Sequence, residues 1–122
     1  MNSEPQLHQV DVLVIGAGTV GLTAALSVPE HLSVAILTKD PSEGSTRWAQ
    51  GGVVAVIDEK DSVESHIRDT LIAGADLCHQ DVVEHVVSNA REAIEWLIQK
   101  GVTFTKSDES FHLTREGGHS YR

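Results

Sequence analysis

The stretch VDVLVIGAGTVGL, residues 10–22, decides the fold of this chain. Residues 10–15 are dominated by β-branched side chains and are followed by a glycine, which predicts a buried strand. The next six residues fit the pattern G-x-G-x-x-G directly after that strand, the setting in which this pattern indicates a dinucleotide site. The candidate cofactor-binding residues of this turn are Gly16, Ala17, Gly18, Thr19, Val20 and Gly21.

Each glycine of the pattern has a physical role. Gly16 allows the tight turn, Gly18 lets a pyrophosphate approach the backbone, and Gly21 lets the helix pack closely on the strand. The start of the helix offers free N–H groups and the positive end of its dipole to a phosphate. A strand–helix turn that merely needs glycine is the less favoured interpretation.

The segments that follow predict a βαβ unit. Residues 22–28 indicate a short helix that ends at Pro29, and residues 33–37 indicate a second buried strand. The crossover makes the two strands parallel. Residues 39–47 form a polar loop. Two parallel strands do not complete a sheet that is covered on both faces, so we expect residues 1–122 to be the N-terminal part of a larger Rossmann-like α/β domain.

Two helices are expected in the second half of the chain. Asp61 is the predicted N-cap of a helix over residues 62–73, with Glu64 as its capping-box partner. A longer helix over residues 81–100 should end at Gly101. Its apolar residues recur at helical spacing and form one stripe: Val82, Val83, Val86, Val87, Ala90, Ile94, Leu97 and Ile98. Residues 102–105 and 111–113 are possible strands around a polar turn at residues 106–109.

Composition narrows the function classes. The formal net charge of −9 on 122 residues argues against partners such as nucleic acid and anionic membranes. A single cysteine, Cys78, fits a reducing compartment, and neither a secretory signal nor a membrane-spanning apolar run is visible, so we expect a cytoplasmic protein. The spacings of the histidines do not suit ligands on one helix face, so no metal site is expected.

The end of the second predicted strand leaves the type of nucleotide open. An acid about 20 residues after the glycine turn usually holds the ribose of NAD, but this strand ends in Thr38 and Lys39. Thr38 can bond a ribose hydroxyl, and Lys39 can meet phosphate or adenine edges. The missing acid weakens an NAD site and is compatible with NADP, and the glycine pattern does not separate either of these from FAD.

Four motifs in this order and spacing carry a family resemblance: GAGTVGL, LTK, EGSTRWAQGG and HLTREGGHS. The chain resembles flavoproteins of the succinate dehydrogenase, fumarate reductase and L-aspartate oxidase group, and within that group the bacterial L-aspartate oxidases most of all. The resemblance extends from Val10 to Arg122. It implies FAD as the cofactor, and it implies that the capping domain and the C-terminal helical domain of the family are absent from this chain.

The resemblance also implies where the flavin ring lies. Family precedent places the ring against residues 45–52, where Gly51 and Gly52 bring the backbone close to it. Succinate dehydrogenases carry a covalently linked histidine where Ser45 stands, so non-covalent FAD is expected here. The candidate residues are Ser45, Thr46, Arg47, Trp48, Ala49, Gln50, Gly51 and Gly52. From the glycines alone, an ordinary tight turn before a strand at residues 53–56 is an equal alternative.

Glu116 is the candidate catalytic residue. The related dehydrogenases have an uncharged residue at this position, where a carboxylate would repel a dianionic substrate. L-Aspartate carries an ammonium group, which Glu116 would attract and so select. Taken without the resemblance, a solvated loop acid is the favoured interpretation of Glu116.

The resemblance therefore implies an FAD-dependent oxidase that converts L-aspartate to iminoaspartate for quinolinate and NAD biosynthesis. Electrons would pass to oxygen or fumarate, and transfer of iminoaspartate to quinolinate synthase is a possible partnership. The alternatives are a fumarate reductase or succinate dehydrogenase flavoprotein fragment and an inactive, truncated nucleotide-binding module. The 122 residues alone are expected to be inactive.

Overall fold

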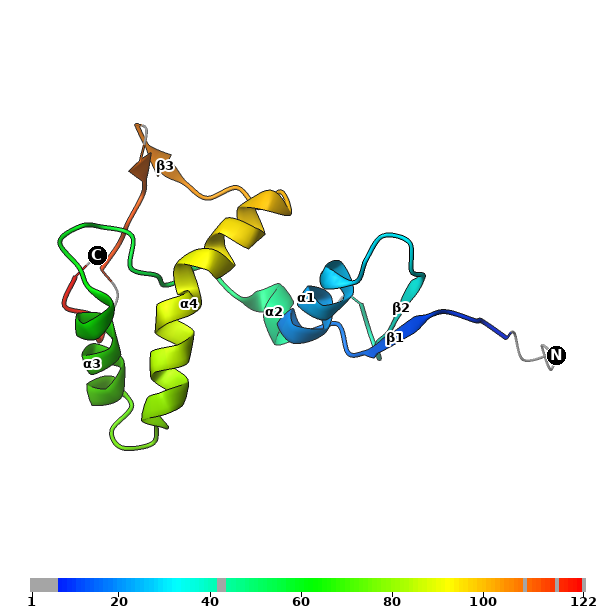
Figure 1. Cartoon of the computed structure of the whole chain (residues 1–122), viewed down its shortest axis with the longest axis horizontal. Coiled ribbons are helices and arrows are strands. Elements are labelled where there is room, and N and C mark those ends of the chain that lie inside the picture. The colour runs from blue at the N-terminus through cyan, green and yellow to red at the C-terminus, as the bar shows by residue number, and fades with distance from the viewer. Residues whose placement is uncertain (1–6, 42–43, 109, 116, 122) are drawn as a thin grey trace. The chain divides into compact units, whose positions relative to one another are not determined.

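A computed structural model of the chain describes residues 7–41, 44–108, 110–115 and 117–121. The chain divides into two compact units, Met1–Gly52 and Val53–Arg122. The first unit holds the nucleotide-type βαβ element, and the second holds a helix pair with a short hairpin. Figure 1 shows the helices and strands of each unit.

The first unit confirms the predicted βαβ arrangement. Strand β1 (Val12–Ile15) and strand β2 (Val34–Leu37) are parallel, with Val12 opposite Val34 and Ile15 opposite Leu37. Helix α1 (Thr19–Ser27) connects them and begins three residues earlier than the apolar pattern indicated. The fold class predicted from the sequence, a Rossmann-like α/β fragment, is therefore correct.

A side-chain clamp fixes the start of this sheet. The Asp11 carboxylate accepts hydrogen bonds from the Ser33 amide at 2.8 Å and from the Ser33 hydroxyl at 2.7 Å. The Ser33 hydroxyl in turn accepts from the Asp11 amide at 3.1 Å. These bonds to Ser33 lower the pKa of Asp11, because they stabilise its charged form.

The predicted burial of both strands is wrong for this chain. Leu13 is 56% exposed, Ile15 is 79% exposed and Leu37 is 58% exposed. Alternate residues of a strand point to opposite faces, and α1 packs on the face that carries Val14. Leu13 and Ile15 therefore lie on the other face of the two-stranded sheet.

Two further expectations for this region need correction. Residues 45–47 are not loop, because Ser45–Trp48 form a one-turn helix, α2, closed by a 3.1 Å bond from the Arg47 amide to the Gly44 carbonyl. Residues 53–56 are not a strand. A strand needs a neighbour with which to share a ladder of hydrogen bonds, so a run of β-branched residues alone does not make one.

In the second unit, α3 (Val63–Ala73) packs against α4 (Gln80–Gln99). The N-cap of α3 is Ser62 rather than Asp61, because the Ser62 hydroxyl accepts from the Ser65 amide at 3.1 Å. Asp61 instead accepts from the Ser62 amide at 2.7 Å. The observed N-cap therefore lies one residue after the predicted one.

The end of α4 at Gly101 is confirmed. Gly101 has φ of 94° and donates to Ile98, while Val102 donates to Leu97, which is the bonding pattern of a Schellman motif. Of the predicted apolar stripe, Val83, Val87 and Ile94 are buried. Other members of the stripe stay exposed: Val82, Val86 and Ile98.

A small hairpin follows α4. Strands β3 (Lys106–Ser107) and β4 (Ser110–Phe111) pair in antiparallel register. The predicted strand at 102–105 is therefore wrong, and of the predicted strand at 111–113 only Phe111 lies in β4. Strand β3 lies inside the polar segment 106–109 that was expected to be the turn. The rings of Phe104 and Phe111 meet edge to face at 6.2 Å, which places the apolar contact beside the paired residues. Within the described residues, no helix is long and apolar enough to span a membrane.

Candidate functional site

The glycine turn between β1 and α1 has the geometry of a nucleotide-binding turn. Gly16 adopts φ of 112°, which a residue with a side chain rarely adopts, and its amide donates to the Leu37 carbonyl at 2.8 Å. A Cβ atom at Gly21 would collide with the carbonyl oxygen of Gly16 and lie 3.3 Å from a methyl group of Val14. The first and third glycines are therefore required by the backbone and by helix–strand packing.

Neither a positive φ nor close helix–strand packing requires a glycine at position 18. Gly18 is the N-cap of α1 with φ of −77°, and the nearest atom to a Cβ added there would be the Thr46 hydroxyl oxygen at 3.9 Å. A Cβ there would make only an ordinary contact with the Thr46 hydroxyl, so no backbone atom blocks the approach of an outside group to Gly18. The first amides of α1 have no acceptor within the helix, and the positive end of the helix dipole lies at this end.

Thr46 connects the two predicted halves of the cofactor site. Its hydroxyl oxygen accepts from the Thr19 amide at 3.2 Å and lies 3.2 Å from the Thr19 hydroxyl. Helix α2 is thus held at the N-terminus of α1, although the two residues are 27 positions apart. The glycine turn and the segment predicted to face the flavin ring are brought together in one unit.

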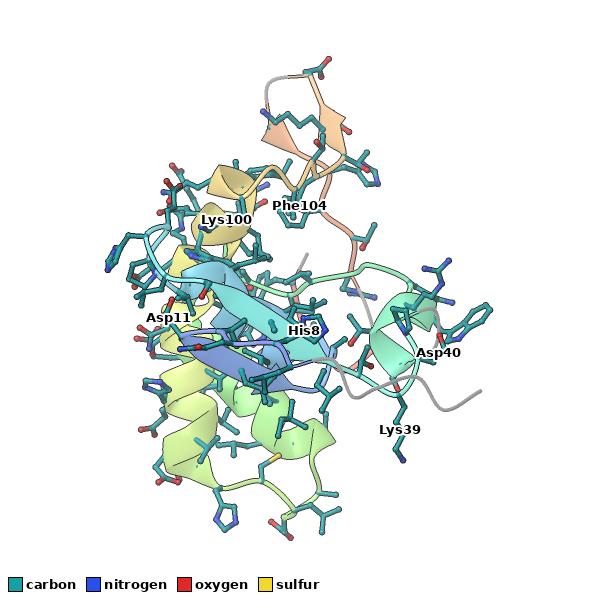
Figure 2. The ribbon with its side chains drawn as sticks, turned by 90° about the vertical axis from the view of Figure 1, so that its right-hand side faces the viewer. His8, Asp11, Lys39, Asp40, Lys100 and Phe104 are labelled. Atoms are coloured by element: carbon teal, nitrogen blue, oxygen red, sulfur yellow. The ribbon has the colours of Figure 1, made fainter. Side chains whose placement is uncertain are left out.

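Thr38 and Lys39 lie at the carboxyl edge of the same sheet. They follow β2 directly, where Leu37 is opposite Ile15. The Thr38 hydroxyl donates to the Asp40 carbonyl at 3.3 Å. The Lys39 side chain is exposed and extends outward from the chain (Figure 2). Ligands of open α/β sheets bind at this edge, so both residues are placed where a nucleotide can reach them.

The rest of the predicted flavin segment is open to solvent. Trp48 is 78% exposed, and Gly51 has φ of 79°. A Cβ atom added at Gly51 or Gly52 would meet nothing within 4 Å. The other predicted residues of this segment are exposed as well: Ser45, Arg47, Ala49 and Gln50. The open backbone at three glycines fits a large, flat, phosphate-bearing group such as FAD.

The second motif folds back onto α3. The Ser120 amide donates to the Asp69 carboxylate at 2.6 Å, and the Ser120 hydroxyl donates to its other oxygen at 3.0 Å. The rings of His119 and His66 lie 4.7 Å apart. Glu116, the candidate catalytic residue, lies outside the described residues.

A hollow of about 840 Å³ adjoins this motif. Its lining includes the side chains of Lys60 and Arg115 as cations and Asp58 as an acid. The other lining residues are His112, Leu113, Thr114, Ser120 and Tyr121. The hollow thus presents two cations, one acid and the hydroxyl groups of Thr114, Ser120 and Tyr121 around one opening.

Burial and hydrogen bonding shift two pKa values near this hollow. Burial lowers the pKa of His66, the neighbouring His119 lowers it further, and Asp61 and Asp69 partly oppose the change. The bonds from Ser120 lower the pKa of Asp69, against the effect of its burial, with smaller contributions from Arg68 and His119. The folded chain thus favours a neutral His66 and an ionised Asp69.

Sequence reasoning missed both His66 and Asp69. The signal that could have found them is their spacing of three on α3, which places a histidine and an acid on the same helix face. Buried acids almost always have partners, so this pattern on a packed helix indicates a binding contact. Within the ranges that the structure covers, no group of three or more histidine, cysteine or acidic residues is arranged to hold a metal ion.

The glycine turn, the parallel strands and the helix N-terminus together define a nucleotide-binding α/β unit. The chain belongs to the FAD binding domain family, whose model matches residues 11–122. The predicted cofactor, FAD, is thereby confirmed.

Among individual proteins, the chain is 55% identical to L-aspartate oxidase of Pseudomonas aeruginosa over 96% of its length and 51% identical to that of Vibrio cholerae over 100%. These matches confirm the resemblance to L-aspartate oxidases. They cover 23% and 24% of those proteins, so the chain spans about a quarter of the length of the curated relatives it matches.

The fold is also similar to a solved structure, Mycobacterium smegmatis Sdh1 in complex with UQ1. The TM-score is 0.77 at 33% identity, over 93% of this chain and 20% of that one.

The open space at Gly18 predicts the effect of Gly18→Val. The variant should keep its fold, because φ is ordinary and no atom stands close, but it should lose FAD because the side chain fills the approach to the α1 amides. Flavin absorbance and circular dichroism of the purified longer flavoprotein measure the two effects. Gly21→Val is the matched control and should damage the fold itself. A folded Gly18→Val protein with normal flavin content would show that this turn does not bind phosphate.

The lowered pKa of His66 predicts a pH dependence of stability. The unfolded chain takes up a proton near the ordinary value of 6.5, whereas folded His66 resists it. Its contribution to stability is therefore present above this pH and is lost as the pH falls toward the lowered folded pKa. The urea midpoint should drop between pH 7.5 and 5.5, and the drop should be smaller in His66→Gln. An exposed histidine on α4, in the variant His85→Gln, serves as the control, and an equal drop in both variants would contradict this assignment.

Proposed function

We propose that this chain is the N-terminal, flavin-binding part of an FAD-dependent oxidase that converts L-aspartate to iminoaspartate. The observation that carries the proposal is the contact of the Thr46 hydroxyl with the Thr19 amide and hydroxyl. This contact joins α2 to the start of α1, and it supports the proposal that one extended cofactor is bound by both segments. The identity of 55% to an L-aspartate oxidase supports the choice of substrate.

The chain's own residues would hold the cofactor non-covalently. The glycine turn and the amides of α1 would bind the pyrophosphate, Thr38 and Lys39 would face the adenosine end, and residues 45–52 would face the ring. When bound, FAD supplies the capacity to accept a hydride from the substrate carbon. The chain provides binding, orientation and charge around that chemistry.

The substrate would bind near the second motif. Lys60 and Arg115 line the hollow and can attract a carboxylate. Glu116 would attract the ammonium group that distinguishes L-aspartate from succinate or fumarate. The remaining dianion-binding groups, the capping domain and the C-terminal helical domain would belong to the longer protein.

The proposal extends to the role of the enzyme in the cell. The enzyme would act in the cytoplasm, supply iminoaspartate for quinolinate and NAD biosynthesis, and pass electrons to oxygen or fumarate. Transfer of iminoaspartate to quinolinate synthase is part of this proposal. The isolated 122 residues would be inactive, because most of the flavin pocket would lie outside them.

A second candidate function is a fumarate reductase or succinate dehydrogenase flavoprotein, which the 33% identity to Sdh1 at a TM-score of 0.77 supports. Ser45 and Glu116 favour the oxidase over this candidate. An inactive nucleotide-binding module is the remaining alternative.

Acid precipitation tests the mode of flavin attachment. Because Ser45 offers no imidazole for a covalent bond, denaturing the longer protein with acid should release its yellow flavin into the supernatant. Absorbance of supernatant and pellet measures the distribution. Flavin that stays in the pellet would contradict non-covalent binding.

The variant Glu116→Gln tests substrate selection. In the longer enzyme, kcat/KM for L-aspartate should fall by about 10-fold or more, the loss expected when a partly desolvated charge pair is removed. Fumarate reduction should fall less or improve, because the neutral amide no longer repels a dianion. The ratio of the two activities is the measured quantity. Equal loss of both activities would show that Glu116 has a structural role, and full retention of both would make it a surface acid.

A further inference from the structure

Three consecutive residues of the second motif dock on one face of α3. Ser120 bonds Asp69, the His119 ring lies against His66, and a Cβ at Gly118 would lie 3.4 Å from the Cβ of Ala73. On α3, His66, Asp69 and Ala73 are spaced by three and four positions and so lie on one face of the helix. The motif is therefore held by a matched row of contacts along α3.

The Asp69–Ser120 pair is the strongest of these contacts. Both carboxylate oxygens accept a bond, one from a backbone amide and one from a hydroxyl. Asp69 is only 9% exposed, so an unpaired carboxylate there would carry a desolvation cost that these two bonds offset. The bonds from Ser120 lower the pKa of Asp69 because they stabilise its charged form, and bonds to an ionised carboxylate are charge-assisted.

The hydrogen bonds between Asp69 and Ser120 hold a residue that borders the hollow. Ser120 lines the hollow together with Thr114 and Arg115. Asp69 is not among the lining residues, so it acts on the hollow only through Ser120. Gly118 adopts φ of 93° in the turn two residues before Ser120, a conformation that favours glycine.

We propose that Asp69 is a positioning residue for substrate binding: its two hydrogen bonds to Ser120 fix the wall of the hollow that carries Thr114 and Arg115. The inference rests on the proposed function, because it takes the hollow to be the place where the carboxylate substrate binds. It assigns to the GGHS segment, and to the aspartate of DTLIAGA, a role in holding the site together rather than in contacting the cofactor.

Four variants of the longer flavoprotein test this role. In Asp69→Asn, an NH2 group replaces one carboxylate oxygen. This group cannot accept a hydrogen bond, so at least one bond from Ser120 is lost. Ser120→Ala loses the hydroxyl bond and keeps the amide bond, while Ser120→Thr retains both. Glu64→Gln, an exposed acid on the same helix, is the matched control for the loss of a negative charge.

Steady-state kinetics with L-aspartate, flavin absorbance and hydrogen exchange at the Ser120 amide are the three measurements. We expect KM to rise about tenfold in Asp69→Asn and less in Ser120→Ala, the size expected for loss of a hydrogen bond to a charged group. Ser120→Thr restores the hydroxyl bond and should bring KM back toward the wild-type value relative to Ser120→Ala, whereas Glu64→Gln should resemble wild type. Flavin content and kcat should change little, and Ser120 amide exchange should accelerate in Asp69→Asn in parallel with KM.

A merely structural role would give a different pattern. Faster exchange in Asp69→Asn with an unchanged KM, or a fall in kcat and flavin content together with no rise in KM, would overturn the positioning role and leave the proposed function intact. A wild-type enzyme that binds flavin but does not oxidise L-aspartate would overturn the proposed function, and the role of Asp69 in substrate binding with it.

Discussion

The close approach of the Gly21 position to the Gly16 carbonyl is the constraint on which the first unit depends. Without side chains at these positions, α1 can begin only four residues after the end of β1 and pack close to the strand. Thr46 then has a helix N-terminus to bond, which holds α2 at the start of α1. One tight turn thus places Gly18 beside Thr46 of the candidate flavin segment, and a Cβ atom at Gly21 would force the start of α1 away from the Gly16 carbonyl.

The same chemistry joins distant parts of the chain twice. In each unit, an aspartate accepts from both the amide and the hydroxyl of one serine: Asp11 with Ser33, 22 positions apart, and Asp69 with Ser120, 51 positions apart. The first pair fixes the start of the parallel sheet, and the second fixes the end of the second motif. Asp11 is exposed and Asp69 is buried. In both cases a carboxylate with two donors gives a fixed direction as well as a contact, which apolar packing alone does not give.

Apolar packing within the described residues is slight. Only Val83, Val87 and Ile94 are buried apolar residues in that part of the chain, and the face of the sheet that carries Leu13 and Ile15 is exposed. A sheet is stabilised by a second layer on each apolar face. The βαβ unit here has that layer, α1, on one face. Directed hydrogen bonds therefore carry a larger share of the arrangement than they would in a domain with a full core.

The sequence by itself determined the βαβ order, the parallel strands, the glycine turn, the end of α4 at Gly101 and the family, because each depends on local backbone demands or on motifs that can be read in order. It misplaced the α3 cap by one residue, because Asp61 and Ser62 can both cap a helix and only the folded chain decides which side chain reaches the free amide. It also misplaced the hairpin by several residues. Only the tertiary structure decided the contact of Thr46 with Thr19 and the docking of Gly118, His119 and Ser120 on His66, Asp69 and Ala73. These contacts join residues far apart in the chain, and no local pattern records which distant donor a carboxylate or a helix end will meet.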